Sequence, residues 1–295
     1  MDIDKKHLTK AGSNYFKHLA YATYYNFLAL LIFITGTIHS FIPWVFAFTP
    51  YKLAKKIVDG TERNISKILR NGTELKSSGT TGPSKSIWQT NTKLREANKA
   101  CRDSQEITKD SKIYTICKME HAGGLLAQTL PAFEIGAEIT VKKFNPWRFC
   151  EEVVNYTHTH ITPTHGRIIA STKGFKDVNM SGLWVTCGSD PVEWDLIEAF
   201  VSKGCTFMAN WGMTEVGPCA INATFRNLDD VYDFKSRSLE GTILGDKAYC
   251  HTDIKDGELY VKGMISVYGN EWYNTKDLVE VNNNGEFYYK GRNNA

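Results

Sequence analysis

The sequence predicts an α/β protein, with a layered α/β body and a smaller, β-barrel-like C-terminal subdomain. Three observations favour this class. Short apolar runs alternate with helical patterns from residue 111 onward, which is typical of helices layered on a largely parallel sheet. After residue 225 the pattern changes to short strands separated by Gly and Asn. The chain of 295 residues is 42% hydrophobic, enough for a sizeable core.

Composition disfavours several other classes of protein. A net charge of +3 is too small to indicate a nucleic-acid partner, and the chain has no RNA-binding signature, heptad pattern or fixed repeat. Residues 1–100 hold 15 Lys and Arg against 6 Asp and Glu, about +9 there and −6 over the remainder, which suits an anionic ligand. The seven cysteines form no CxxC pair, so they predict neither a disulfide framework nor a zinc site, and a cytoplasmic location fits best.

The first long pattern is an apolar stretch over residues 18–51 that contains no Asp, Glu, Lys or Arg. Its length alone would allow a membrane span. Three residues interrupt it, namely Gly36, His39 and Pro43. We therefore expect a buried helix of about 12–15 residues, a turn and a strand, and we expect no membrane partner. A secretory signal is disfavoured because acidic residues precede a late apolar run.

The following segments are assigned from their periodicity. Residues 52–70 carry apolar positions at helical spacing and end at an Asn-Gly turn, and residues 91–101 predict another helix. Strands are expected at IYTIC (113–117) and AEITV (137–141), and helices at PWRFCEEVVNYT (146–157) and PVEWDLIEAFVSK (191–203). In the C-terminal part, Asp256-Gly257 and Asn284-Gly285 are hairpin-turn dipeptides between strand-like segments.

A loop over residues 77–85 (SSGTTGPSK) is the strongest chemical signal. Its glycines let the backbone turn and expose N–H groups, its hydroxyls donate to phosphate oxygens, and its lysine supplies positive charge. We expect it to bind phosphate. A flexible linker is the plain alternative. The other is a Walker A loop, whose spacing Gly79 to Ser86 nearly matches, but no buried strand precedes it and no Walker B aspartate follows.

The loop resembles the (S/T)SG(S/T)TGxPK signature of acyl-adenylate-forming enzymes, the superfamily of acyl-CoA synthetases and AMP-binding ligases, with Pro83 one place early. Further motifs follow in the family's order. Residues 120–125 (EHAGGL) resemble FHxxGL, and residues 188–191 (GSDP) resemble GGxP. Residues 210–215 (NWGMTE) resemble NxYGxTE, and residues 257–263 match GELxxxG. Residues 272–277 (WYNTKD) resemble WxxTGD with lysine for glycine, and Gly291-Arg292 resembles the GR that opens the hinge.

The resemblance implies a role for each matched residue. Those implied in phosphate contact are Ser78, Gly79, Thr80, Thr81, Gly82, Lys85 and Thr214. Those implied along the adenine are Gly188, Ser189, Asp190, Asn210, Trp211 and Gly212. Asp277 would hold the ribose with help from Arg292, Glu215 would hold magnesium, and His121 and Gly124 would border the acyl pocket. The catalytic group would be Thr81, Lys85, Thr214 and Glu215.

Two of these residues have plain alternatives, and so does a group of histidines. Taken alone, His121 would be an ordinary helix-start residue and Trp211 a core residue. His158, His160 and His165 invite a metal-binding interpretation, but no carboxylate is spaced to complete a site. The resemblance makes residues 157–166 (THTHITPTHG) a strand and loop beside the acyl pocket.

The resemblance extends from about Asn26 to Arg292 and would make the early apolar stretch a helix and a strand of the adenylating domain. It divides the chain into a core over 1–225, a β-rich subdomain over 226–292 and a hinge start at 293–295, without the small C-terminal domain. The stretch after residue 143 resembles small aryl- and acyl-CoA ligases, which include the o-succinylbenzoate enzyme.

The implied reaction joins a carboxylic acid to the α-phosphate of ATP, giving an acyl-adenylate and pyrophosphate. ATP and Mg²⁺ would be required, and CoA or a carrier protein would accept the acyl group. The family's small domain carries a lysine aimed at the α-phosphate, so either a second polypeptide supplies it, or the chain is a fragment, or it retains only binding. The alternatives are a catalytically weak nucleotide-binding protein and a P-loop NTPase.

Overall fold

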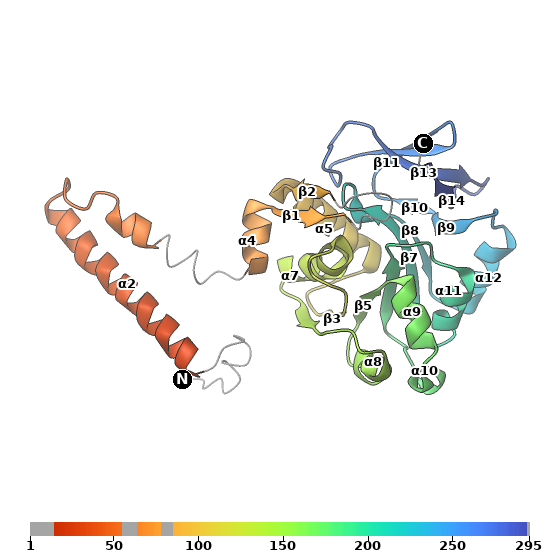
Figure 1. Ribbon diagram of the computed structural model, residues 1–295, viewed down its shortest axis with the longest axis horizontal. Coiled ribbons are helices and arrows are strands. Elements are labelled where there is room, and N and C mark those ends of the chain that lie inside the picture. The colour runs from red at the N-terminus through yellow and green to blue at the C-terminus, as the bar shows by residue number, and fades with distance from the viewer. Residues whose placement is uncertain (1–14, 55–63, 78–84, 294–295) are drawn as a thin grey trace. The chain divides into compact units, whose positions relative to one another are not determined.

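The computed structural model describes residues 15–54, 64–77 and 85–293, and it divides the chain into two units (Figure 1). The first unit is Met1–Lys67 and the second is Ile68–Ala295. This division lies far from the change of pattern after residue 225, where the expected core and β-rich subdomain meet. Residues 1–14, 55–63, 78–84 and 294–295 lie outside the described residues. Most of the 77–85 loop, part of the helix expected over 52–70 and most of the hinge start at 293–295 fall in these ranges.

The first unit consists of one long helix and a return segment. Helix α2 (Tyr15–Phe41) runs for 27 residues and is followed by bends and turns over 42–48 and a helical turn over 49–54. The described residues of this unit contain no strand. The expected short helix, turn and strand are therefore wrong, and with them the assignment of this stretch to the core of the adenylating domain.

Helix α2 continues through the residues that were expected to break it. A glycine inside a helix costs only about 1 kcal/mol relative to alanine, so Gly36 does not end it. Hydroxyls of the last turns donate to carbonyls four residues earlier, from Thr35 to Leu31 at 2.7 Å and from Ser40 to Gly36 at 2.9 Å. Pro43 lies beyond the last helical residue, where its missing N–H breaks no helical hydrogen bond.

The second unit starts within α4 (Asn64–Asn71), which ends at the expected turn, where Gly72 has a φ of 83°. Strands β1 (Thr73–Lys76) and β2 (Ser86–Gln89) then pair antiparallel. Helix α5 (Asn91–Gln105) follows, and the Thr90 hydroxyl caps it by accepting from the Lys93 N–H at 3.2 Å. The predicted helix over 91–101 is thus confirmed and extends one turn further.

A seven-stranded mixed sheet forms the centre of the second unit, in the order β10-β8-β7-β6-β5-β3-β4. The five strands from β4 to β7 are parallel, while β8 and β10 are antiparallel to their neighbours. This confirms the predicted largely parallel sheet. The strands are β3 (Lys112–Thr115), β4 (Glu138–Val141), β5 (His158–Ile161), β6 (Trp184–Gly188), β7 (Thr206–Met213), β8 (Gly217–Phe225) and β10 (Lys247–Ala248).

Helices cover both faces of this sheet, as Figure 1 shows. One face carries α5, α6 (Ala122–Gly124), the π-helical turn η1 (Leu125–Thr129) and α7 (Leu130–Glu134). The other carries α8 (Pro146–Val153), α9 (Pro163–Ala170), α10 (Lys173–Asp177), α11 (Trp194–Val201) and α12 (Leu228–Ser236). Alternate residues of one strand face the two layers, since Val185 packs with α11 residues and Trp184 packs with Cys101 of α5.

The C-terminal part is a five-stranded antiparallel sheet in the order β11-β12-β13-β14-β9. Its strands are β9 (Thr242–Gly245), β11 (His251–Lys255), β12 (Glu258–Lys262), β13 (Tyr273–Val281) and β14 (Phe287–Arg292). Asp256 and Gly257 both have positive φ and join β11 to β12 in a two-residue turn, as predicted. Among the described strands β9 and β11 are not paired with each other, so the sheet is open and not a closed barrel.

Candidate functional site

A pocket of ≈ 250 Å³ opens beyond the carboxyl ends of β6 and β7, where strands β9, β13 and β14 of the smaller sheet close it. The carboxyl ends of parallel strands are where open α/β sheets bind ligands. Seven residues predicted from motifs line this pocket: Ser189, Asp190, Asn210, Trp211, Gly212, Asp277 and Arg292. The pocket therefore brings together four motifs that are spread over about a hundred residues of chain.

The loop after β6 has the conformation that the motif's glycines would favour. Ser189 has a φ of 81°, in the left-handed region that side chains rarely adopt. A Cβ on Gly188 would overlap the backbone and side-chain oxygens of Asn210 on the neighbouring strand β7. Glycine at 188 thus allows β6 and β7 to approach closely. Ser189, with its strained backbone, begins the loop that lines the pocket.

Asn210 lines this pocket and carries an unsatisfied side-chain acceptor. Its side-chain amide donates to the Pro218 carbonyl, which fixes the orientation of the group. Its Oδ1 is buried and has no hydrogen-bond partner among the described residues. An unpaired buried acceptor costs about 1–3 kcal/mol, so a ligand that donates a hydrogen bond here would recover that energy.

Trp211, Asp277 and Arg292 form a hydrogen-bonded group on one wall of the pocket. The Trp211 indole N–H donates to Asp277 Oδ2 at 2.9 Å, and Arg292 Nε lies 3.4 Å from Asp277 Oδ1. Asp277 and Arg292 are register partners on β13 and β14. Burial raises the pKa of the Asp277 carboxyl, whereas the indole N–H and the guanidinium act in the opposite direction.

Lys276 occupies the place where the motif has glycine, and its backbone shows why glycine is usual there. Its φ is 65°, a conformation that costs a residue with a Cβ about 1–2 kcal/mol. The Asn274 side chain accepts from the Lys276 N–H at 2.8 Å and supports this turn of the strand. The lysine side chain is exposed and lies 3.6 Å from Glu258.

The described ends of the 77–85 loop lie side by side. The Ser77 N–H donates to the Lys85 carbonyl and the Lys85 N–H donates to the Ser77 hydroxyl, each at 2.9 Å. The loop joins the antiparallel strands β1 and β2. A Walker A loop leads from a strand into a helix, so this geometry contradicts the P-loop NTPase alternative. Five predicted phosphate contacts, Ser78, Gly79, Thr80, Thr81 and Gly82, lie outside the described residues.

Thr214 and Glu215 lie in the turn between β7 and β8, outside the set of pocket-lining residues. The Gln89 side chain, at the end of β2, donates to the Thr214 carbonyl at 3.0 Å. The buried Lys93 ammonium donates in turn to Gln89 Oε1 at 2.6 Å. The strand that follows the 77–85 loop is thereby tied to the Thr214-Glu215 turn.

The sequence did not mark Gln89 and Lys93 as site residues. Both side chains are buried, which is unusual for glutamine and lysine. Burial lowers the pKa of Lys93 to about 8, while the nearby Glu215 carboxylate partly opposes this shift. Burial raises the pKa of Tyr268 and of Tyr273, and the Glu215 charge adds to both shifts; the two rings are stacked at 4.5 Å between their centroids. A polar residue at the first turn of α5 was the one available signal, and such residues are usually solvent-exposed.

His121 and Gly124 lie at the start of α6 and do not line the pocket. His121 is exposed, while Gly124 is buried so closely against Lys118 that a Cβ would overlap its carbonyl. The adjoining Gly123 packs on the His160 ring and the Ser189 hydroxyl. The start of α6 thus borders the same strand ends as the pocket, by way of residues 123, 160 and 189.

The three histidines His158, His160 and His165 have different surroundings. His158 bonds to the Gln105 carbonyl at 2.9 Å, and His165 completes a capping box at the start of α9. Burial, together with His165, lowers the pKa of His160 to about 4. No group of three or more His, Cys, Asp or Glu suited to a metal ion occurs among the described residues. The segment was expected to be a strand and a loop, but the helix α9 begins directly at Pro163.

Comparison with protein families places this fold and pocket in a known class. Residues 77–269 match the family described as AMP-binding enzyme, and the chain belongs to this family. Residues 1–64 match a different family, DUF6356, whose function is unknown. The family match thus begins at the 77–85 loop and excludes the early apolar stretch that the resemblance was expected to include.

Curated relatives are CoA ligases of low identity. The chain is 23% identical over 249 residues to 2-succinylbenzoate–CoA ligase of Staphylococcus epidermidis, covering 79% of this chain and 51% of the relative. It is 25% identical over 235 residues to indoleacetate–CoA ligase of Aromatoleum aromaticum, covering 73% and 46%. The chain therefore spans about half the length of these curated relatives.

Solved structures share the fold. The N-terminal domain of FACL13 from Mycobacterium tuberculosis superposes with a TM-score of 0.62 at 17% identity, covering 75% of this chain and 60% of that one. ATP-bound MatB from Rhodopseudomonas palustris gives a TM-score of 0.60 at 18% identity, covering 75% and 48%. The predicted adenylating fold is thus confirmed.

Proposed function

We propose that this chain binds ATP and a carboxylic acid and catalyses formation of an acyl-adenylate, as an acyl-CoA-synthetase-like ligase. One observation carries the proposal. Asn210, Trp211, Asp277 and Arg292, which come from three motifs, line a single pocket with an unpaired acceptor and a buried carboxylate. An adenosine offers matching groups, namely an amino edge that donates, a flat ring and two ribose hydroxyls.

Each residue in the pocket has a task that its chemistry allows. Asn210 Oδ1 accepts from the adenine amino group, and the Trp211 ring borders the base. The Asp277 carboxylate accepts from the ribose hydroxyls while the indole N–H and Arg292 hold it in place. Ser189 and Asp190 form the wall that follows β6. These residues position the nucleotide, which is most of what the protein must do in this reaction.

In this proposal the ATP phosphates lie next to the Thr214-Glu215 turn. Lys85 and the hydroxyls of the 77–85 loop neutralise and bind phosphate oxygens there. Glu215 supplies one carboxylate, and this fits magnesium because Mg²⁺ is usually held by one or two carboxylates together with substrate phosphates. When bound, the ion would neutralise charge on the phosphates. The buried Lys93 and Gln89 hold the turn that carries Glu215 and act as positioning residues.

ATP–pyrophosphate exchange with a panel of carboxylic acids tests the proposal. We expect exchange that depends on Mg²⁺ and on one class of acid, and Asp277→Asn should lower it at least tenfold by removing the charge that binds the ribose. The exposed Asp195→Asn on α11 is the control and should leave exchange unchanged. A thermal shift with Mg-ATP but no exchange with any acid would instead support a catalytically weak nucleotide-binding protein.

The acceptor and location follow from the same proposal. CoA is the acceptor suggested by the curated relatives, which are CoA ligases by name. The second unit would work in the cytoplasm, where ATP and CoA are available. A thioester product that forms only when CoA is added, followed by mass spectrometry, would distinguish CoA from a carrier protein.

A further inference from the structure

The long helix of the first unit has the properties of a membrane span. Leu19–Phe41 extends over 23 residues with a mean hydropathy of 1.4, and only 11% of its most apolar window is buried. At a rise of 1.5 Å per residue, about 20 residues cross the hydrocarbon core of a bilayer. No Asp, Glu, Lys or Arg occurs between residues 18 and 51.

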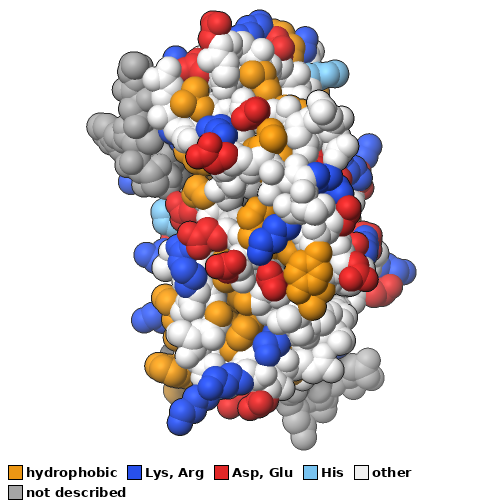
Figure 2. All heavy atoms as spheres, turned by 90° about the vertical axis from the view of Figure 1, so that its right-hand side faces the viewer, with side chains coloured by type: hydrophobic (Ala, Val, Ile, Leu, Met, Phe, Trp, Pro, Cys, Tyr) orange, Lys and Arg blue, Asp and Glu red, His pale blue; other side chains and the backbone are white. Residues whose placement is uncertain are grey.

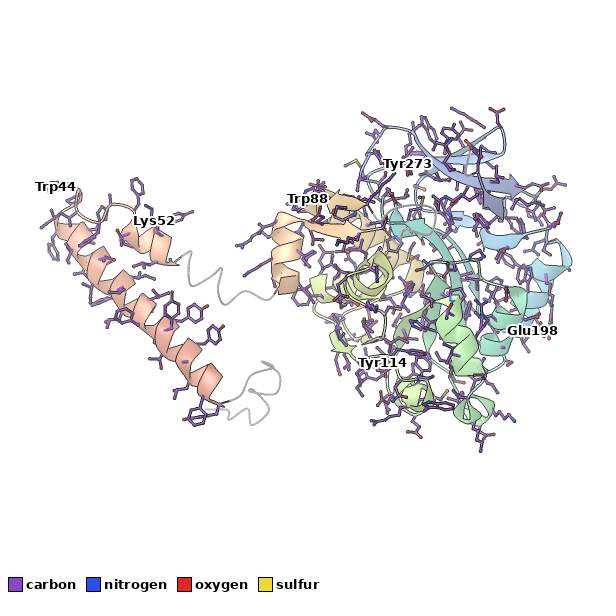
Figure 3. The ribbon with its side chains drawn as sticks, viewed as in Figure 1. Trp44, Lys52, Trp88, Tyr114, Glu198 and Tyr273 are labelled. Atoms are coloured by element: carbon purple, nitrogen blue, oxygen red, sulfur yellow. The ribbon has the colours of Figure 1, made fainter. Side chains whose placement is uncertain are left out.

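The helix is apolar all around, which separates a span from other kinds of helix. Figure 3 shows side chains projecting from every side of α2. Phe33 and Ile34 are adjacent and so about 100° apart on the helix, and they are 70% and 43% exposed. Leu28 and Thr35, seven residues apart, are buried on one side of the helix, whereas most of its other large apolar side chains are exposed. A soluble core helix would bury a broad apolar stripe, and a helix lying on a membrane surface would carry a charged face, and α2 has neither.

Three hydroxyls near the end of this helix are satisfied within the helix, as a bilayer requires. The hydroxyls of Thr35, Thr37 and Ser40 donate to carbonyls of the same helix and therefore need no water. Phe41 ends the helix and is highly exposed, as are Trp44 and Phe48 on the return segment, and lysines begin at Lys52 (Figure 3). Exposed aromatic residues followed by lysines are typical of the boundary between lipid tails and head groups.

The surface of the second unit offers a contrast. On the face in Figure 2, hydrophobic side chains lie in small groups between basic and acidic ones, as expected of a protein surface in water. The family match of residues 1–64 also ends close to the division at Lys67. The long apolar helix thus belongs to a separate unit of the chain.

We propose that α2 inserts into a lipid bilayer as a single span and anchors the second unit to the membrane, with residues 42–51 in the head-group region. Lipid is the partner that covers the exposed surface of this helix. This inference does not depend on the proposed acyl-adenylate chemistry, because it uses only residues 15–54. It replaces the expectation of a protein without a membrane partner.

The test starts from the full chain expressed in cells. We expect most of it to sediment with membranes, to resist alkaline carbonate and to be released by detergent. The double variant Leu30→Lys/Ile34→Lys places two charges at exposed positions near the middle of the helix, each reducing insertion about 100-fold, and should move the chain to the soluble fraction. Val141→Lys/Val154→Lys, at exposed positions of the second unit, is the matched control and should stay with the membrane.

Two further measurements separate lipid from other occupants. The purified wild-type chain is mixed with preformed liposomes of phosphatidylcholine and phosphatidylglycerol, and the detergent is then removed. We expect the chain to float with the liposomes. Binding only to cell membranes would indicate a protein partner and overturn the proposal. Intact mass should show that the membrane-bound chain retains residues 15–41. A chain cleaved after this helix and released would make α2 a signal sequence, and a soluble carbonate extract would equally contradict the proposal.

Discussion

At the scale of single residues, the buried Lys93 is the least expected feature of the site. It lies on α5, its ammonium is almost fully buried, and its partners are the Gln89 oxygen and, more distantly, the Glu215 charge. A buried cation usually requires a close carboxylate. Here a neutral amide serves as the direct partner, which explains why burial lowers the pKa of this lysine to about 8.

This shift predicts how stability depends on pH. Between about pH 8 and the unfolded value of about 10.4, the unfolded chain binds a proton at residue 93 that the folded chain has lost, so the contribution of Lys93 to the free energy of unfolding rises with pH, opposite in sign to that of the cysteines whose pKa burial raises. The rise is at most about 1.4 kcal/mol per pH unit. Urea unfolding of the full chain in mild detergent, from about pH 8 to about pH 9.5, should show it.

The matched variants identify the residue responsible. Lys93→Met should remove this part of the pH dependence, because methionine has a similar length and does not titrate. Lys99→Met, on the exposed side of the same helix, should retain it. Equal slopes in the two variants would mean that Lys93 does not titrate in this range.

At the scale of elements, the strand that carries Asp277 contains a turn that lysine fits poorly. Lys276 has a φ of 65°, and the usual motif has glycine in this place. Lys276→Gly should therefore raise the free energy of unfolding by about 0.5–1 kcal/mol and preserve nucleotide binding, since Asp277 keeps its position. Lys276→Ala removes the same side chain but keeps the Cβ, so it should not stabilise. Thermal or urea unfolding of the three chains measures this, and stabilisation by alanine as well would assign the effect to the lost lysine side chain.

Motifs and turn dipeptides predicted much of the second unit, whereas the first unit was predicted wrongly. The parallel strands, α5, the Asp256-Gly257 turn and the antiparallel strands follow from local patterns, because the period of apolar residues and the turn chemistry agree. The error over residues 18–51 arose from treating Gly36 and His39 as helix breakers. Within a long apolar helix their cost is small compared with the many hydrogen bonds that continue.

The pocket was predictable only in part, for a reason of geometry. Asn210, Trp211 and Asp277 carry recognisable motifs, so their roles could be proposed from sequence. The link from Lys93 through Gln89 to Thr214 depends on the Gln89 side chain meeting a backbone carbonyl 125 residues away, which no local pattern encodes. Closing an open β-sheet into a barrel likewise depends on long-range pairing of edge strands, and here β9 and β11 stay apart.

At the scale of the whole molecule, the two units have different surroundings. The second unit holds the pocket, and the first holds the helix that we place in lipid. A membrane anchor confines the pocket to a layer near the bilayer without changing the residues that line it. Binding of Mg-ATP should therefore stabilise the full chain in detergent, by about 2.7 kcal/mol at a ligand concentration 100 times Kd.

The last prediction concerns the chemistry that these residues do not supply by themselves. In the proposed function, the pocket residues, the 77–85 loop and the Thr214-Glu215 turn bind adenine, ribose and phosphates, which are present in the ground state, whereas a small domain of the kind that the resemblance implies would add a lysine at the α-phosphate. A cation that acts mainly in the transition state contributes to rate more than to binding. Residues 1–295 alone should thus bind ATP and an acyl-adenylate analogue, yet exchange pyrophosphate about 10²–10³-fold more slowly than with a matching small domain supplied in trans or fused after Ala295. If a small domain does not enhance pyrophosphate exchange by residues 1–295, another cation stabilises the transition state. Lys276 precedes Asp277 in the sequence, so Lys276→Met would be the first variant to test.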